Sequence, residues 1–202
     1  MFDKNKNTIH FIFFLSLLIL NSCDLFKTRN PQEPEDNSIS FLPATSPNIL
    51  FSNFTQSFVG LNTENYYDCF VKIDNYFAYD YTFLPEPNAL ARFSGVFSQW
   101  NAQSERTFLI GLKSNIEKGF KPELIWSNGN YEAISPDSAI YLSEYQLQIF
   151  SQKKLEYYSG IARLSFIRSN NGIWYIKTWQ DISTNQSDTS KTWSILKAQI
   201  SL

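Results

Sequence analysis

The sequence predicts an α+β fold in which several helices precede an antiparallel sheet. Beyond residue 46, apolar residues first recur with helical spacing, and the last third of the chain alternates apolar and polar residues over long runs. The chain has 202 residues, of which 43% are hydrophobic and 18% are charged, so it is able to bury a core. We expect residues 47–202 to form one domain around one core.

The first helix is expected to begin at Ser46-Pro47, because a hydroxyl N-cap followed by proline is a typical helix start. Gly60 is expected to end it. Its apolar face repeats every four residues and consists of Leu50, Phe54 and Phe58. A second short helix, capped by Asn62 or Thr63, has an apolar face of Tyr66, Phe70 and Cys69.

The middle of the chain predicts a strand and more helix. Residues 77–83 alternate aromatic residues with small or polar ones, which is the period of a half-buried strand. A helical stretch over 88–100 contains Gly95, which weakens it, and a better helix covers 105–116. The apolar side of that helix holds Phe108, Leu109 and Leu112.

The last third predicts a meander of four antiparallel strands. Asn170-Asn171-Gly172 separates the final two and is a strong hairpin signal, because tight turns need residues that tolerate positive φ. The expected strands cover residues 123–127, 138–150, 155–169 and 173–182. The tail over 192–200 is a short apolar segment that we expect to pack back onto the domain.

The N-terminus predicts an exported, lipid-anchored protein. Lys4 and Lys6 precede an apolar run that is shorter than the ~20 residues of a membrane-spanning helix, which is typical of a signal peptide. Leu20-Asn21-Ser22-Cys23 then resembles the lipobox of bacterial lipoproteins, in which the cysteine is acylated and becomes the first residue. We therefore expect residues 1–22 to be removed and Cys23 to anchor the protein on the extracytoplasmic side of the cell envelope, at either the inner or the outer membrane.

Residues 23–46 are expected to link this anchor to the domain. The segment contains prolines and acidic residues and few aliphatic ones, so it cannot bury enough apolar area to offset the entropy of ordering it. If Cys23 carries lipid, Cys69 has no intramolecular disulfide partner, and we expect it to be a small buried hydrophobe.

Composition excludes several classes of function. The one histidine, His10, lies in the expected signal peptide, so the mature chain has none for a catalytic triad or a metal site. A net charge of −2 gives no electrostatic footprint for nucleic acid. With seven glycines, scattered acidic residues and no calcium-loop pattern, we expect no phosphate loop, no metal and no cofactor.

The order of elements resembles the nuclear transport factor two-like, or cystatin-like, cone that ketosteroid isomerases share. Two segments carry the resemblance locally: Asn62–Phe70 as the short second helix, and Gly172-Ile-Trp174-Tyr-Ile176 as the start of the final strand. The resemblance covers residues 47–182. It implies a curved antiparallel sheet wrapped around a pocket that the helices close, and it implies no particular activity.

Five residues are candidates for ligand contact inside such a cone: Tyr81, Trp126, Trp174, Trp179 and Asp181. Faces of tryptophan and tyrosine stack on flat ligands or sugars, although aromatic residues on strands more often pack a core. Ketosteroid-isomerase-like sites use a carboxylate base, for which Asp80 and Asp181 are candidates. A solvated Asp80 and a strand-ending Asp181 are the simpler interpretations, so we assign no catalytic residue.

The final strand needs a bulge if its tryptophans are to share a face. Strict alternation puts Trp174 and Ile176 on one side and Trp179 on the other. An extra residue at Lys177-Thr178 would bring Trp179 and Asp181 onto the concave side. There, Trp179 would either contact a ligand or pack beneath the C-terminal tail beside Trp193.

Three functions remain open. The first is a non-catalytic, lipid-anchored domain that binds a small ligand or a protein, and an open apolar cleft would favour it. The second is a cone-fold isomerase or dehydratase that uses aspartate and tyrosine, which a closed, wet cavity with a carboxylate would favour. The third is an assembly module that forms a homodimer through its open sheet face, which a filled cone with an apolar sheet exterior would favour.

Overall fold

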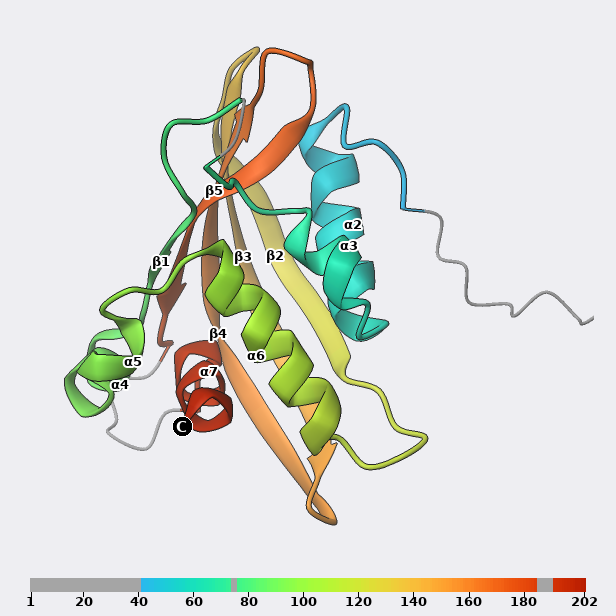
Figure 1. Ribbon diagram of the computed structural model, residues 1–202, viewed down its shortest axis with the longest axis vertical. Coiled ribbons are helices and arrows are strands. Elements are labelled where there is room, and N and C mark those ends of the chain that lie inside the picture. The colour runs from blue at the N-terminus through green and yellow to red at the C-terminus, as the bar shows by residue number, and fades with distance from the viewer. Residues whose placement is uncertain (1–40, 74–75, 185–190) are drawn as a thin grey trace, which may run out of the picture. The chain divides into compact units, whose positions relative to one another are not determined.

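The computed structural model describes residues 41–73, 76–184 and 191–202, all within one compact unit, Ile39–Leu202. The chain order is helices, one short strand, helices, four strands and a last helix (Figure 1). The helices are α2 (Pro47–Val59), α3 (Thr63–Tyr67), α4 (Pro87–Arg92), α5 (Ser94–Phe97), α6 (Ala102–Asn115) and α7 (Trp193–Ser201). The strands are β1 (Thr82–Leu84), β2 (Glu123–Ile134), β3 (Ser138–Ser151), β4 (Lys154–Arg168) and β5 (Trp174–Ile182).

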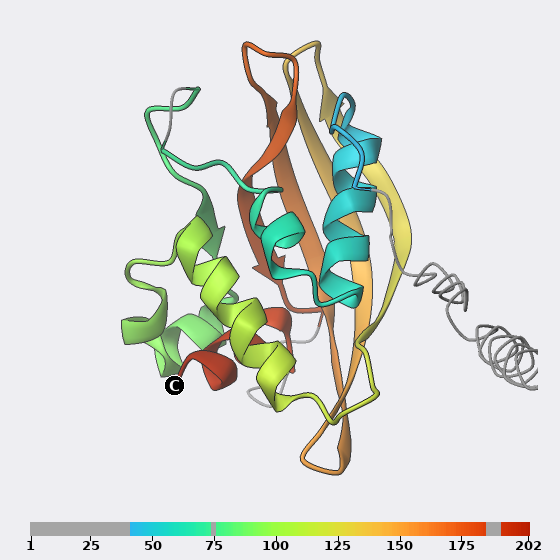
Figure 2. The same cartoon turned by 45° about the vertical axis from the view of Figure 1, so that its right-hand side comes forward.

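The strands form one five-stranded sheet in the order β1-β5-β4-β3-β2. Strands β2 to β5 are an antiparallel meander, and β1 pairs with β5 in parallel. Figures 1 and 2 show the helices gathered on one side of this bent sheet. The predicted α+β class, with N-terminal helices on a curved, mainly antiparallel sheet, is therefore confirmed.

The helix starts follow their predicted caps. The hydroxyl of Ser46 accepts a hydrogen bond from the N–H of Ile49 (3.3 Å), and α2 begins at Pro47 as expected. The side chain of Asn62 caps α3 through the N–H of Asn65 (3.2 Å). Helix α2 ends before Gly60, but the positive φ that follows it belongs to Leu61 (52°).

The strand expected over residues 77–83 is mostly wrong, since only Thr82–Leu84 forms β1. The N–H of Tyr81 bonds both to the carboxylate of Asp80 (2.8 Å) and to the carbonyl of Val71 (3.1 Å). The same carboxylate lies 3.4 Å from the N–H of Ala102 at the start of α6. An aspartate that binds nearby backbone N–H groups competes with a strand ladder, and this fixes the segment as a connection.

Two other boundaries differ from expectation. The helix expected over 88–100 is divided at Phe93 into α4 and α5, and α6 begins at Ala102 because Asn101 and Ser104 form a capping box before it. Strand β2 continues to Ile134 through a register shift between Ser127 and Asn130. The strand expected to end at 127 thus continues through a bulge.

The bulge predicted in the last strand is present. Thr178 pairs with Ser165 and Ile176 with Phe166, which leaves Lys177 as the extra residue. Trp174, Ile176, Trp179 and Asp181 are all buried, on the side of the sheet that faces the helices. The adjoining hairpin turns at Gly172, whose φ is +86°.

The core lies between the sheet and the helices. Its largest fully buried side chains include Trp179, Trp193, Tyr66, Tyr81 and Tyr145. The expected apolar tail forms α7, in which every residue from Trp193 to Ala198 is buried. Cys69 is buried as expected, and burial raises the pKa of its thiol.

The packing of the domain begins a few residues before the expected boundary at Pro47. Ala44 is buried, and its carbonyl accepts a hydrogen bond from the N–H of Trp174 (2.8 Å). The signal peptide, Cys23 and the linker up to residue 40 lie outside the described residues. Within the part that the structure does describe, no helix has the length and apolarity to cross a membrane.

A substitution at Gly160 on β4 tests how closely the backbone packs here. A Cβ atom there would lie 2.6 Å from the hydroxyl oxygen of Tyr145 and 2.7 Å from the backbone carbonyl oxygen of Ile182. We expect Gly160→Ala to lower the free energy of unfolding by about 1–3 kcal/mol, because the backbone of β5 would have to shift. Urea denaturation measures the change.

Gly95→Ala is the matched control, since a Cβ atom on Gly95 meets nothing within 4 Å. It should leave stability unchanged or raise it by up to about 1 kcal/mol, because alanine restricts the unfolded chain more than glycine does. Equal effects of the two substitutions would contradict the packing described here.

Candidate functional site

A buried carboxylate, Glu105, lies at the centre of the interior. It belongs to the first turn of α6, and its side chain is fully buried. The ammonium of Lys197 from α7 donates to Oε1 (2.5 Å). Three more donors complete the shell: the hydroxyls of Tyr66 (2.9 Å) and Tyr81 (2.8 Å) and the indole N–H of Trp100 (2.8 Å). Both oxygens of Glu105 are therefore used by side chains of the protein itself.

Lys197 is the cation of this cluster and is also fully buried. Its ammonium nitrogen lies 3.6 Å from the ring centroid of Phe83 and 3.8 Å from that of Trp179, so two aromatic faces contact it as well as the carboxylate. Burial lowers the pKa of Lys197 to about 8, and the negative charge of Glu105 opposes that shift.

A second buried carboxylate, Asp181 on β5, binds the start of α7. It accepts hydrogen bonds from the hydroxyl of Tyr145 (2.7 Å) and from the backbone N–H (2.7 Å) and hydroxyl (2.5 Å) of Ser194. The hydroxyl of Tyr145 in turn accepts from the N–H of Trp193 (2.7 Å). Burial raises the pKa of Asp181, and these hydrogen bonds oppose the shift.

The two carboxylates are both buried and hydrogen-bonded within the chain. A general base must come within hydrogen-bond reach of the proton that it removes. Here Glu105 is fully buried and Asp181 is 1% exposed, and their donors are side chains and backbone of the same chain. In the described part of the chain, no group of three or more His, Cys, Asp or Glu residues could hold a metal ion.

Three of the five predicted ligand-contact residues meet in this interior. Tyr81 binds Glu105, Asp181 binds α7, and Trp179 packs against Trp193 with ring centroids 4.6 Å apart. Trp179 thus lies beneath the C-terminal segment, which was the alternative to ligand contact. Its indole ring is fully buried.

Trp126 borders the same interior, since its ring stacks on Trp193 with centroids 6.1 Å apart while its indole N–H donates to the hydroxyl of Thr55 (3.0 Å). Trp174 lies elsewhere and lines a surface pocket of about 380 Å³, together with Cys69 and Lys72. Ligand binding by the five residues stays a prediction. Asp80, the other candidate base, is half-buried and bonds to backbone N–H groups.

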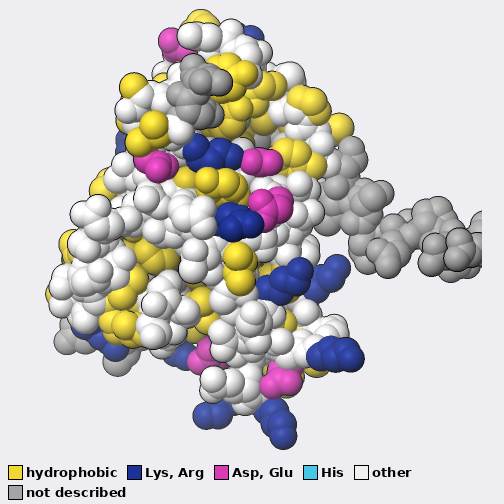
Figure 3. Space-filling model, in the orientation of Figure 1, with side chains coloured by type: hydrophobic (Ala, Val, Ile, Leu, Met, Phe, Trp, Pro, Cys, Tyr) yellow, Lys and Arg dark blue, Asp and Glu magenta, His cyan; other side chains and the backbone are white. Residues whose placement is uncertain are grey.

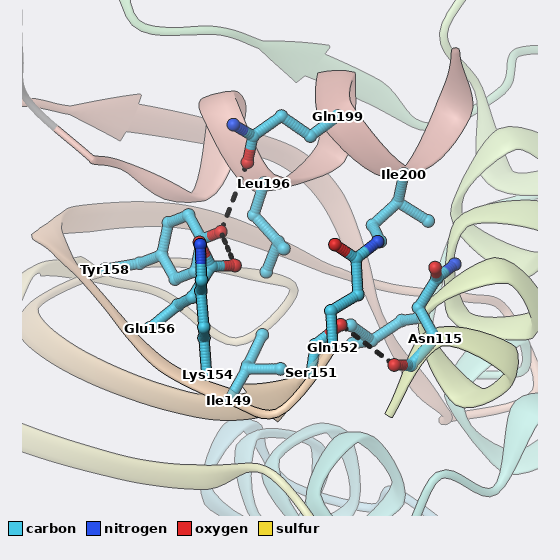
Figure 4. Close-up of a pocket in the computed structure, with 11 residues that line it drawn as sticks. Asn115, Ile149, Ser151, Gln152, Lys154, Glu156, Tyr158, Leu196, Gln199 and Ile200 are labelled. Atoms are coloured by element: carbon cyan, nitrogen blue, oxygen red, sulfur yellow. Dashed lines mark hydrogen bonds between the residues drawn. The ribbon is translucent and has the colours of Figure 1, made fainter. Parts of the chain in front are cut away.

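A pocket of about 310 Å³ opens where the end of α6, the tip of the β3–β4 hairpin and α7 meet (Figure 4). The hydroxyl of Tyr158 lies 3.0 Å from a carboxylate oxygen of Glu156 and 3.1 Å from the amide oxygen of Gln199. The apolar side chains that line the pocket are Leu112, Ile149, Leu196 and Ile200. The polar ones are Asn115, Ser151, Gln152, Lys154, Glu156, Tyr158 and Gln199.

Some of the charges on the helical face form ion pairs. Figure 3 shows side chains of both signs close together over α3 and α6. Two ion pairs occur there, Lys72 with Asp68 (2.7 Å) and Arg106 with Glu64 (2.6 Å). Such exposed pairs contribute little to stability.

Solved structures resemble this domain at low sequence identity. A proposed aromatic ring hydroxylase from Novosphingobium aromaticivorans is 12% identical, with a TM-score of 0.54 over 76% of this chain and 93% of that chain. A proposed scytalone dehydratase from the same organism is 13% identical, with a TM-score of 0.52 over 70% and 83%. A proposed calcium/calmodulin-dependent protein kinase II association domain from Xanthomonas campestris is 12% identical, with a TM-score of 0.51 over 69% and 86%.

The domain has the nuclear transport factor two-like cone fold, with helices on one side of a curved, mainly antiparallel sheet. No protein-family model and no curated protein matches the sequence. At these identities the likeness shows the fold alone, and the names of the three proteins span a hydroxylase, a dehydratase and an association domain.

Sequence reasoning missed the two charged residues at the centre of the cone. Glu105 precedes Phe108, Leu109 and Leu112 by three, four and seven residues, so it lies on the same helical face as the apolar side chains. Lys197 follows Trp193 by four residues. This spacing was the available signal that both charges point inward.

Replacing Lys197 by methionine tests the ion pair in the cone. Removing one partner of a buried pair leaves the other charge uncompensated, so we expect Lys197→Met to lower the free energy of unfolding at pH 7 by about 3–5 kcal/mol.

Burial lowers the pKa of Lys197 from 10.5 to about 8. Between about pH 8 and 10 the unfolded chain therefore holds a proton that the folded protein has released, and stability rises with pH. Relative to Lys197→Met, wild-type protein should gain stability over that range in urea denaturation.

Lys191→Met is the control, because Lys191 is half-exposed and pairs with Glu156 at the surface. It should change stability by less than about 1 kcal/mol at pH 7. A wild-type advantage over Lys197→Met that is constant or falls between pH 8 and 10 would contradict the lowered pKa.

Proposed function

We propose that this protein is a non-catalytic, lipid-anchored binding domain of the cell envelope. The observation that carries the proposal is the engagement of both interior carboxylates, Glu105 and Asp181, by residues of α7. A cone-fold isomerase would use such carboxylates as an acid or a base, whereas here they hold the last helix in place.

Binding is then assigned to the pocket of Figure 4, which differs from the interior in being open to solvent. Its apolar floor and its three carboxamides, from Asn115, Gln152 and Gln199, suit a small ligand that carries hydroxyl or amide groups. The sequence supports envelope anchoring through Leu20-Asn21-Ser22-Cys23.

The anchor is tested at Cys23. Acylated protein should sediment with membranes, because each CH₂ group of the lipid chain that is buried in the bilayer contributes roughly 0.8 kcal/mol to the free energy of membrane binding. We expect Cys23→Ser to abolish processing or to move the protein to the soluble fraction, and the mass of the N-terminal peptide should lose its lipid. Membrane retention that is unchanged by Cys23→Ser, with no lipid on that peptide, would overturn the proposed anchor.

The pocket is tested by filling it. Gln199→Trp adds a large ring at the lining, whereas Ser201→Trp adds the same ring at an exposed position on the same helix. Melting temperatures are measured with monosaccharides and dipeptides as probes. A bound probe at about 100 times its Kd should raise Tm by about 5–10 °C in wild type and in Ser201→Trp, and not in Gln199→Trp. If none of the probes distinguishes the two variants, binding at this pocket is contradicted.

Assembly is the second candidate, and the outer face of the sheet favours it. Ile125 and Tyr157 are each 60% exposed there and line a pocket of about 250 Å³, with Leu155 exposed nearby on β4. Contiguous exposed apolar side chains are typical of protein interfaces. A purified protein that stays monomeric in analytical ultracentrifugation would exclude this alternative.

A further inference from the structure

We propose that the inside of the cone is a binding site for a primary ammonium group, which Lys197 of α7 occupies. This site is separate from the pocket of Figure 4, so it goes beyond the proposed function and is tested independently of it. Three observations carry the proposal: the shell around the ammonium, the charge balance of the interior and the fit of α7.

The shell around the ammonium of Lys197 has the parts of a cation site. Glu105 supplies a charge-assisted hydrogen bond (2.5 Å). The ring centroids of Phe83 and Trp179 lie 3.6 and 3.8 Å from the nitrogen, and that of Trp100 lies at 5.4 Å. Aromatic faces around an ammonium are how proteins recognise organic cations. These four residues come from α6, β1, β5 and the segment before α6, so the cage does not depend on α7 for its walls.

The charge balance of the interior also favours a cation. Among the described residues, the buried carboxylic acids are Glu86, Glu105 and Asp181, and Lys197 is the one buried basic side chain. Glu86 receives the N–H of Ala89, and Asp181 receives donors from Tyr145 and Ser194, so neither has a cationic partner of its own in direct contact. Removing the ammonium would leave three acids in an apolar interior, where an uncompensated carboxylate is strongly disfavoured.

Part of the contact around α7 fits less well than its ammonium does. Trp179 Nε1, Thr192 Oγ1 and Trp193 Nε1 are buried without a hydrogen-bond partner. Two of the three belong to the start of α7 or the residue before it, and the third belongs to the ring that Trp193 packs against. Buried polar groups are normally paired, so these three atoms mark an unmatched part of the contact between α7 and β5, beside the bonds that join Ser194 to Asp181. The ammonium in its cage, in contrast, has a hydrogen-bonded carboxylate and two aromatic faces around it.

The site selects a primary ammonium on an unbranched aliphatic chain. The nitrogen has a carboxylate on one side and aromatic rings on others, including Phe108, whose ring centroid is 5.9 Å from it, and the whole side chain of Lys197 is buried. Because Lys197 is fully buried, an outside amine enters only when the side chain is absent or α7 moves.

The test removes the side chain and supplies its missing atoms. Lys197→Ala deletes three methylene groups and the ammonium, which together correspond to n-propylammonium. We expect n-propylammonium at about 100 times its Kd to raise the Tm of Lys197→Ala by about 5–10 °C. Neutral 1-propanol should raise it by less than a third as much, and Lys197→Met, whose cage is filled by an uncharged chain, should not respond to either probe.

A second variant separates ammonium recognition from the filling of a cavity. Glu105→Gln combined with Lys197→Ala keeps the space and removes the charge, so it should bind n-propylammonium at least tenfold more weakly than Lys197→Ala. Equal responses to the amine and the alcohol, or equal affinities in the single and double variants, would overturn the proposal.

The same probes decide the outcome if Lys197→Ala does not fold in buffer. Its refolding from urea is then measured with n-propylammonium and with 1-propanol, and recovery with the amine alone supports the site. Equal recovery with both, or recovery with neither, overturns it. Membrane anchoring by Cys23 and binding at the pocket of Figure 4 are measured separately, and neither depends on this result.

Discussion

The ion pair between Glu105 and Lys197 is the interaction on which the arrangement of the interior depends. Both side chains are fully buried, so each charge has lost its water and needs the other. Glu105 begins α6 and Lys197 lies in α7, and the pair therefore fixes these two helices against each other inside the bent sheet. The hydroxyls of Tyr66 and Tyr81 complete the shell of Glu105 and connect the pair to α3 and to the segment before β1.

The second carboxylate extends this constraint to the sheet. Asp181 holds Ser194 at the start of α7 through two hydrogen bonds, and Tyr145 on β3 bonds to Asp181 and to the backbone of Trp193. The bulge at Lys177 is what turns Asp181 and Trp179 toward the helices. One extra residue in β5 therefore decides whether α7 has a carboxylate to bind. Because α7 is held from within at Ser194 and at Lys197, the proposed function places small-ligand binding at a surface pocket and not in the interior.

Local signals in the sequence predicted local features well. Ser46-Pro47 marked the start of α2, Asn170-Asn171-Gly172 marked the last hairpin, and the spacing of Trp174, Ile176 and Trp179 predicted the bulge. Each of these depends on residues within a few positions of one another. The strand expected at 77–83 failed because the side chain of Asp80 competes for backbone N–H groups, a contact that alternation does not report.

The central site could not be predicted in the same way, because its partners are 92 residues apart in sequence. A glutamate in the first turn of a helix is ordinarily read as a favourable charge at the positive end of the helix dipole, and this reading requires no buried partner. A lysine in a short apolar tail is ordinarily taken to extend into solvent. Only the spacing of Glu105 with Phe108 and Leu112, and of Lys197 with Trp193, contradicts these interpretations, and spacing alone does not say that the two inward charges meet. That they meet follows from the fold, which packs α7 against α6. A charged residue on the apolar face of a helix is therefore best interpreted together with every opposite charge on another such face, since a buried charge without a partner would be too costly to keep.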